Sequence, residues 1–206
     1  MPPARIVELL LPFDIKLDEL RLNQISTYID LLLRWNARIN LTAIRDLEDI
    51  VTRHFGESLF AAQYLFPAPS QLHAIDIGSG AGFPGIPLKI WNPLLRLTLI
   101  ESNHKKATFL REVVRTLTLT DVDVIAARAE THPPDSADVV TLRAVERFES
   151  ILPTAANLVA KAGRLALLLG HSQVGQIPNL APQFSWNTPV QLPQSNSRIL
   201  LIGTRT

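Results

Sequence analysis

Two acidic residues and a run of glycines occupy positions at which a parallel sheet can bind a nucleoside cofactor. Asp76 lies in an apolar run that leads directly into the loop Gly78-Ser79-Gly80-Ala81-Gly82. Glycines allow the backbone to take positive φ and allow a ligand to approach it closely. Glu101 ends the next apolar run, 23 residues after Gly78, where a carboxylate can accept hydrogen bonds from both hydroxyls of a ribose. The spacing therefore predicts an adenosine-containing cofactor, held by Asp76, Gly78, Gly80 and Glu101.

Two classes of cofactor fit a glycine loop of this kind. The stretch from Gly80 to Gly85 spells G-x-G-x-x-G, the pyrophosphate fingerprint of dinucleotide-binding proteins. In that pattern the first glycine follows the strand directly, whereas here Gly78 and Ser79 intervene, and Pro84 offers no amide to a phosphate. An acid two residues before the first glycine favours S-adenosylmethionine, whose methionine part carries a cationic amino group. We interpret the loop as a site for S-adenosyl-L-methionine and keep a NAD-dependent oxidoreductase as the alternative.

Three further residues lie where the predicted sheet would present its carboxyl edge. Ala129 and Glu130 follow the third strand, in the loop that usually borders the adenine of such a cofactor. Arg143 ends the fourth strand, where an arginine could bind the cofactor carboxylate or the substrate. Enzymes that methylate exocyclic amines of bases commonly carry an Asp/Asn-Pro-Pro-aromatic motif at this place. This chain has Thr141-Leu142-Arg143-Ala144 instead.

The sequence carries no recognisable general base, nucleophile or metal site. It contains no cysteine, which excludes disulfides, thiolate metal ligands and a cysteine nucleophile. It also lacks a Ser/His/Asp or paired-carboxylate pattern, so we assign no catalytic residue and no metal. Such a chain suits a reaction in which placement of the reactants does the work.

The elements that must position these residues alternate between short apolar runs and helical stretches. We predict strands at 72–77, 95–100, 122–126, 138–142 and 164–169. Helices are predicted at 86–91, 104–117 and 151–161. This alternation indicates a parallel sheet covered on both faces. Runs at 184–192 and 198–203 are joined too closely for a crossover helix, so we expect an antiparallel edge pair. The fold class is α/β, a doubly wound Rossmann-like methyltransferase sheet, mostly parallel with an antiparallel C-terminal edge strand.

The first 70 residues have a different pattern and are predicted to form an N-terminal helical extension packed on the core. Leu22, Ile25, Ile29 and Leu32 repeat at helical spacing with polar residues between them. A second helix is predicted to begin at Asp46, whose side chain can cap the free amides, and to end before Pro67. The methyltransferase core is expected to span residues 71–206.

Composition limits the class of protein. The chain has 206 residues, 47% hydrophobic and 19% charged, with a formal net charge of +1. This balance is globular, and it does not by itself point to nucleic acid. No segment approaches the ~18 apolar residues of a membrane span, and the leucine run at 9–11 is too short for a signal peptide. We expect a cytoplasmic protein without a membrane partner.

Several motifs resemble the small-subunit ribosomal RNA methyltransferase G family, also called glucose-inhibited division protein B. They cover most of the chain and include, in order, Leu31-Leu32-Leu33-Arg34-Trp35-Asn36, Ile39-Asn40-Leu41-Thr42, Arg53-His54, Ser58-Leu59, Asp76 to Pro87 and Arg143-Ala144. The Phe83-Pro84-Gly85-Ile86-Pro87 tail of the glycine loop is the most specific of them. One departure is Leu169, because the family usually has a lysine just before the glycine that closes the fifth strand.

The resemblance implies transfer of a methyl group from S-adenosylmethionine to N7 of a guanine in small-subunit (16S) ribosomal RNA. It implies cofactor contacts at Gly78, Phe83, Ala129, Glu130 and Arg143. The implied partner is the ribosomal RNA or the 30S particle, with no obligate protein partner. A methyltransferase-like RNA-binding assembly factor without catalysis remains as a second alternative.

The candidate RNA contacts lie mainly in the N-terminal region. They are Arg34, Asn40, Arg53, His54 and Arg143, with Arg38 and Arg45 nearby. Asn40 and His54 could equally be caps or satisfied polar groups of the core. A second basic group, formed by Lys105, Lys106, Arg111 and Arg115, could share the phosphate contacts.

Overall fold

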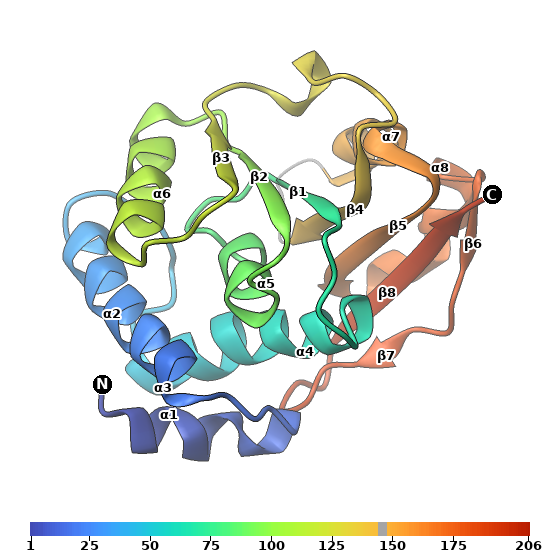
Figure 1. The fold of residues 1–206 in the computed structure, drawn as a ribbon. Coiled ribbons are helices and arrows are strands. Elements are labelled where there is room, and N and C mark those ends of the chain that lie inside the picture. The colour runs from blue at the N-terminus through green and yellow to red at the C-terminus, as the bar shows by residue number, and fades with distance from the viewer. Residues whose placement is uncertain (144–147) are drawn as a thin grey trace.

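Short runs of valine, isoleucine and leucine form one eight-stranded sheet at the centre of the molecule (Figure 1). The computed structural model describes residues 1–143 and 148–206. The strands are β1 (His73–Ile77), β2 (Arg96–Ile100), β3 (Val122–Ile125), β4 (Ala137–Arg143), β5 (Val159–Gly170), β6 (Phe184–Trp186), β7 (Val190–Gln191) and β8 (Arg198–Arg205). Their order is β3-β2-β1-β4-β5-β8-β6, and β7 also pairs with β8.

The direction of the strands confirms the predicted fold class. Strands β1 to β5 pair in parallel, while β8 is antiparallel to β5, β6 and β7. The chain runs outward from β1 to β3 and then returns to place β4 on the other side of β1. The carboxyl ends of β1 and β4 therefore border a topological switch point, the usual place for a ligand in an open α/β sheet.

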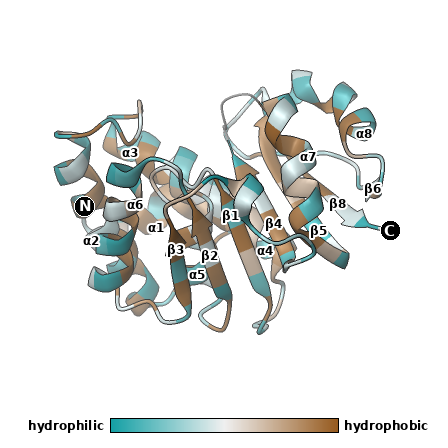
Figure 2. Ribbon diagram, turned by 90° about the horizontal axis from the view of Figure 1, so that it is seen from above, coloured by the Kyte–Doolittle hydropathy of each residue, from teal (hydrophilic) through white to brown (hydrophobic). Residues whose placement is uncertain are grey.

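Side chains alternate between two apolar layers, one on each face of the sheet. One layer joins the sheet to α5 (Gly85–Trp91) and α6 (His104–Thr116), and the other joins it to α7 (Phe148–Leu158) and α8 (Ile177–Leu180). In β1, for example, Ala74 belongs to the first layer and Ile75 to the second. Figure 2 shows the hydrophobic strands between helices whose colours are mixed, as expected when each helix buries one stripe.

The N-terminal helices pack on the face that carries α5 and α6. They are α1 (Pro3–Leu10), η1 (Leu11–Phe13), α2 (Glu19–Asn36), α3 (Leu47–Asp49), the π-helical η2 (Ile50–Gly56) and α4 (Glu57–Leu65). Buried residues of α1, α2 and α4, among them Ile6, Ile29 and Leu59, belong to the same apolar cluster as α5 and α6. The division of the chain near residue 70 stays a prediction, because this shared core gives no independent test of it.

The cap predicted at Asp46 is confirmed, but the helix after it is not regular. Asp46 Oδ1 accepts hydrogen bonds from Glu48 N at 2.9 Å and from Asp49 N at 3.0 Å. One turn later the chain enters the π-helical segment η2 before α4 begins. A π-helical turn is typical of functional sites, and this one carries Arg53 and His54.

Two predicted boundaries were wrong. The helix expected at 151–161 ends at Leu158, because Val159 already pairs with Ala137 as the first residue of β5. The run expected at 184–192 is broken into β6 and β7, with Pro189 between them, which cannot donate to a ladder. Within the described residues, no helix is long and apolar enough to cross a membrane.

Candidate functional site

The glycine loop leaves β1 in a conformation that ordinary residues rarely adopt. Gly78, Gly80 and Gly82 have φ of 64°, 56° and 89°. The amides of Gly78 and Ser79 both donate to Ile100 O, at 2.9 and 3.2 Å, which ties the loop to the end of β2. Gly78 is exposed, so its backbone is open to a ligand at the carboxyl edge of the sheet.

Asp76 lies directly beneath this loop and is 1% exposed. Its Oδ1 accepts a hydrogen bond from Thr141 Oγ1 at 2.7 Å, and its Oδ2 accepts one from Gly85 N at 3.2 Å. Its carbonyl accepts from Ser79 Oγ at 2.9 Å. Burial raises the pKa of Asp76 to about 6, against the opposing effect of the hydrogen bonds from Thr141 and Gly85. The carboxylate thus joins β1, β4 and the start of α5, and it orients the loop through them.

Glu101 fastens the other side of the loop. It is 7% exposed, and its Oε2 accepts a hydrogen bond from Gly80 N at 2.8 Å. Its Oε1 accepts one from Asn103 N at 2.7 Å, just before α6. Each carboxylate oxygen has two lone pairs, so both can still accept a hydrogen bond from a ribose hydroxyl.

Phe83 packs between two aromatic rings of the N-terminal helices. Its ring stacks on His54 at 4.6 Å and 13° and on Tyr28 at 5.3 Å and 5°, and Phe55 meets it edge-on. The hydroxyl of Tyr28 donates to Ala81 O in the glycine loop. The ring of Phe83 therefore faces the helices, and the N-terminal region braces the loop that sequence analysis assigned to the cofactor.

The remaining predicted cofactor residues lie along the same edge of the sheet. Ala129 is buried and Glu130 exposed in η3 (Ala129–Thr131), which follows β3. Arg143 ends β4 on the other side of the glycine loop. From β4 to β3 the edge thus presents Arg143, the glycine loop, Glu101 and then Ala129 with Glu130. Ala144, named with Arg143 in the sequence motif, lies outside the described residues.

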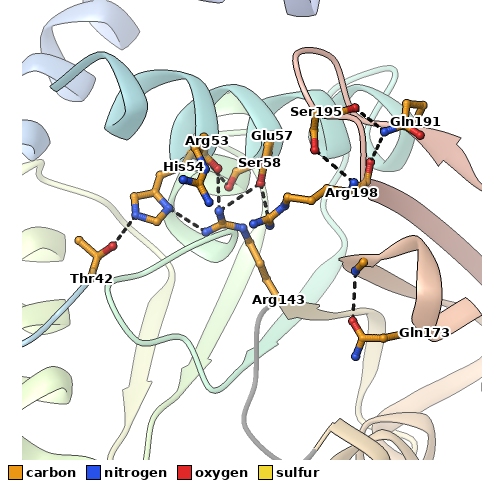
Figure 3. A network of polar contacts seen from close by, with 11 residues as sticks. Thr42, Arg53, His54, Glu57, Ser58, Arg143, Gln173, Gln191, Ser195 and Arg198 are labelled. Carbon is orange, nitrogen blue, oxygen red and sulfur yellow. Dashed lines mark hydrogen bonds and ion pairs between the residues drawn. The ribbon is translucent and has the colours of Figure 1, made fainter. Parts of the chain in front are cut away.

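Arg143 is held by the N-terminal helices (Figure 3). Its Nη1 donates to His54 Nδ1 at 2.9 Å, and its Nη2 donates to Arg53 O at 2.6 Å and to Glu57 Oε2 at 3.1 Å. The side chain is 6% exposed. Burial lowers the pKa of Arg143, and the neighbouring Glu57 opposes that shift. The guanidinium is consequently fixed at the carboxyl edge, next to the loop.

The partners of His54 determine its tautomer. An arginine can only donate, so His54 Nδ1 accepts from Arg143, and Nε2–H donates to Thr42 Oγ1 at 2.8 Å. Burial, and then the charge of Arg143, lowers the pKa of His54 to about 2. The ring is neutral, 7% exposed and bonded at both nitrogens. Of the two roles open to His54 in the sequence, this geometry favours the satisfied polar group of the core.

The other candidate RNA contacts are exposed but dispersed. Arg34, Asn40 and Arg53 lie at the surface, and Arg34 Nε donates within its own helix to Asp30 O at 3.2 Å. Asn40 belongs to a loop that Asn36 organises, with Asn36 Oδ1 accepting from Leu41 N and Thr42 N. On α6, Arg115 pairs with Glu112, and Arg111 donates to Val124 O on β3.

Glu57 and Arg198 also belong to the site, although neither is predicted from the sequence. Glu57 Oε2 contacts Arg198 Nη2 at 2.9 Å as well as Arg143. Arg198 begins β8, and because β8 is antiparallel to β5, its first residue pairs with Gly170 at the carboxyl edge. The antiparallel strand predicted at 198–203 was the sequence signal that could have placed Arg198 at this edge. Leu169, the departure from the family pattern, is 6% exposed and pairs with Ile199 in the apolar core.

These residues fit S-adenosylmethionine. The open backbone at Gly78 suits close approach of the cofactor, and Glu101 has lone pairs left for a ribose. Across 1–143 and 148–206 there is no cluster of three or more histidine, aspartate and glutamate side chains that could hold a metal ion.

The sequence matches the family model described as rRNA small subunit methyltransferase G over residues 21–196. The ribosomal RNA small subunit methyltransferase G of Chloroflexus aggregans is 40% identical, with 97% of this chain and 88% of the relative covered. The proteins of the same name from Roseiflexus castenholzii and Staphylococcus aureus are 40% and 39% identical. Those matches cover 91% and 79% of this chain, and 85% and 70% of the relatives.

Solved structures resemble the fold at low sequence identity. A SAM dependent methyltransferase from Aquifex aeolicus has a TM-score of 0.61 at 15% identity, covering 78% of this chain and 94% of that chain. A predicted O-methyltransferase from Agrobacterium tumefaciens has a TM-score of 0.62 at 18% identity, covering 72% and 80%. The shared architecture is that of a methyltransferase domain.

Proposed function

The chain belongs to the rRNA small subunit methyltransferase G family, and from this premise we propose that it methylates N7 of a guanine in small-subunit ribosomal RNA. The methyl donor is S-adenosylmethionine. The observation that carries the proposal is the family match over residues 21–196, which includes the glycine loop, Glu101 and Arg143. The same match decides against the NAD-dependent oxidoreductase.

The surroundings of the loop suit a reaction without a general base. N7 of guanine has a free lone pair and no proton to lose, so the enzyme must mainly align the reactants. His54 is neutral and bonded at both nitrogens, and Asp76 is buried beneath the loop, so neither is placed to accept a substrate proton. When bound, the cofactor supplies an electrophilic methyl group on a cationic sulfur.

Each residue at the edge has a binding or orienting role in this proposal. Asp76 fixes the loop from below, and Glu101 binds the ribose while it holds Gly80. Ala129 and Glu130 border the adenine, and Gly78 offers its backbone to the methionine part. Arg143 lies between the cofactor and the N-terminal helices, where it binds the cofactor carboxylate or the substrate.

The substrate is proposed to be the 30S particle or a precursor of it, in the cytoplasm. A net charge of +1 provides little general attraction for naked RNA. A folded particle, which presents a surface of defined shape, is therefore the better substrate. The N7 edge is too deep to reach inside an A-form helix, so the target guanosine is expected to be splayed from a loop.

Transfer of labelled methyl groups tests the proposal. The chain is incubated with labelled S-adenosylmethionine and either small ribosomal subunits or naked small-subunit RNA, and the modified base is mapped. Label at guanine N7 is expected, and more of it with the particle. Gly78→Arg should abolish transfer, because an arginine there blocks the cofactor side of the loop. Gly175→Arg is the matched control, since nothing lies within 4 Å of a Cβ at that position. Label on another atom or on neither substrate contradicts the assignment.

A further inference from the structure

Glu57 holds two arginines from different parts of the chain at a single oxygen. Its Oε2 lies 3.1 Å from Arg143 Nη2 and 2.9 Å from Arg198 Nη2. Figure 3 shows the two guanidinium groups converging on this carboxylate from β4 and β8. The side chain of Glu57 is 3% exposed, that of Arg143 6% and that of Arg198 23%.

The two arginines of this group share one carboxylate. Two arginines carry two positive charges, and Glu57 supplies one negative charge. His54, which also contacts Arg143, is neutral and adds none. The charge of Asp76 also acts on Arg143, whereas Glu57 is the one carboxylate paired with Arg198 among the described residues. A buried charge is costly unless it is paired, so Arg198, which shares its carboxylate with Arg143, is the arginine that gains more from a further anion.

The hydrogen bonds are incomplete as well. Among the residues that the structure describes, three buried side-chain polar atoms lack a partner, and two of them are Arg143 Nε and Arg198 Nε. In Arg198 the unpaired Nε–H lies on the edge of the guanidinium that binds phosphate or carboxylate in a bidentate manner. In Arg143 the Nη2 of that edge already donates to Arg53 O and to Glu57 Oε2. The unpaired Nε–H of Arg198 and the carboxylate it shares thus both point to an anionic ligand with more than one acceptor oxygen.

The topology separates Arg198 from the cofactor residues that follow β1, β2 and β3. The glycine loop, Glu101 and Ala129 follow β1, β2 and β3, whereas Arg198 begins β8, which lies beyond β4 and β5 on the opposite side. Arg198 is also the more exposed arginine, so an incoming anion reaches it first. The anion is therefore expected to come from the substrate side of the edge.

We propose that Arg198 binds a phosphodiester of the RNA strand that carries the target guanosine, with Glu57 and Arg143 setting the position of its guanidinium. One phosphodiester brings one negative charge, which pairs with Arg198 and leaves Arg143 paired with Glu57. Gln191 and Ser195 fix the backbone of Arg198, through Gln191 Nε2 to Arg198 O at 2.9 Å and Arg198 N to Ser195 Oγ at 3.1 Å. This inference rests on the proposed function, since it needs RNA as the substrate.

The test compares Arg198→Gln with Arg205→Gln on the same strand. Arg205 lies at the other end of β8 and is 25% exposed against 23% for Arg198, and it also pairs with a carboxylate, the exposed Asp135. KM and kcat for methylation of small ribosomal subunits are measured over a range of salt, and binding of S-adenosylhomocysteine by calorimetry. Arg198→Gln should raise KM about 10- to 100-fold and lower the slope of log KM against log salt by about one. Affinity for S-adenosylhomocysteine should change less than about twofold in both variants.

Two results overturn the proposal. One is a loss of affinity for S-adenosylhomocysteine in Arg198→Gln as large as the rise in KM, which would assign the arginine to the cofactor carboxylate. The other is a KM and a salt slope like those of the wild type. If Arg198→Gln does not fold, Arg198→Lys keeps the charge without the bidentate edge, and it should raise KM less while retaining the salt slope. Lack of methyl transfer by the wild type would instead contradict the proposed function, independently of either variant.

Discussion

Asp76 and His54 are ionisable residues that the fold forces away from their ordinary pKa values, in opposite directions. Burial raises the pKa of Asp76 to about 6 and lowers that of His54 to about 2. Both residues are bonded to protein groups that orient the glycine loop or Arg143. Their effect on the reaction is therefore indirect, through the groups they hold.

Cofactor affinity should depend on the ionisation of Asp76. Below pH about 6 the carboxyl gains a proton and becomes a poorer acceptor for Thr141 Oγ1 and Gly85 N, so the loop is held less firmly. The dissociation constant of S-adenosylhomocysteine should rise as pH falls from 7 to 5. In Asp76→Asn it should be at least about tenfold higher at pH 7 and independent of pH.

Calorimetry across this pH range checks the expectation, with Asp123→Asn as the control. Asp123 lies on β3, is exposed and should leave both the affinity and its pH dependence unchanged. A pH dependence in Asp76→Asn equal to that of the wild type would show that another group is responsible.

At the scale of elements, the glycine loop is held by helix α2 as well as by its own strand. Gly82 has a φ of 89°, and a Cβ there would lie 2.3 Å from Tyr28 Oη and 2.7 Å from Ile86 Cδ1. Gly82→Ala should lower the free energy of unfolding by about 2 kcal/mol or more, because both the backbone and the packing oppose it. Urea denaturation measures this loss.

The matched substitution is Gly175→Ala in η4 (His171–Gln176), where a Cβ meets no atom within 4 Å. It should change the free energy of unfolding by less than about 0.5 kcal/mol. Equal effects at the two glycines would mean that the contact between α2 and the loop contributes little to stability.

The elements also show which features a sequence can reveal. Strand β1, its glycine loop and the acid at Glu101 follow from local pattern, because each depends on a few neighbouring residues. The π-helical segment η2 and the end of α7 depend on tertiary pairing, as Val159 with Ala137 shows. Arg198 and Glu57 are separated by most of the chain and carry no motif. Their meeting follows only from the antiparallel return of β8.

At the scale of the whole molecule, the buried His54 and Asp76 should make opposite contributions to the pH dependence of the free energy of unfolding. Unfolding returns the pKa of His54 from about 2 to an ordinary 6.5, so the unfolded chain takes up a proton below pH 6.5. The free energy of unfolding therefore decreases as the pH is lowered below 6.5. Asp76 goes from about 6 to 3.8 on unfolding, so the native state holds the extra proton between these values. The contribution of Asp76 to the free energy of unfolding therefore increases as the pH falls through that window. This increase offsets part of the loss caused by His54.

A substitution at His54 should remove its share of this pH dependence. His54→Gln is expected to be less stable than the wild type at pH 8, because Arg143 and Thr42 lose a well-fitted partner. The gap in unfolding free energy should narrow below pH 6.5, by up to about 1.4 kcal/mol per pH unit. Urea denaturation between pH 5 and 8 measures it. A gap for His54→Gln that is constant with pH would mean that the native ring accepts a proton as readily as the unfolded one.

The stack of Tyr28, Phe83 and His54 restricts how this sequence can diverge. The three rings come from α2, the segment after the glycine loop and η2, and the ring of Phe83 stacks face to face on both of the others. A smaller ring or an aliphatic side chain at one position leaves a void that the other two must fill. Substitutions at these positions should therefore be inherited together in related lineages, so the N-terminal helices and the cofactor loop evolve as one unit.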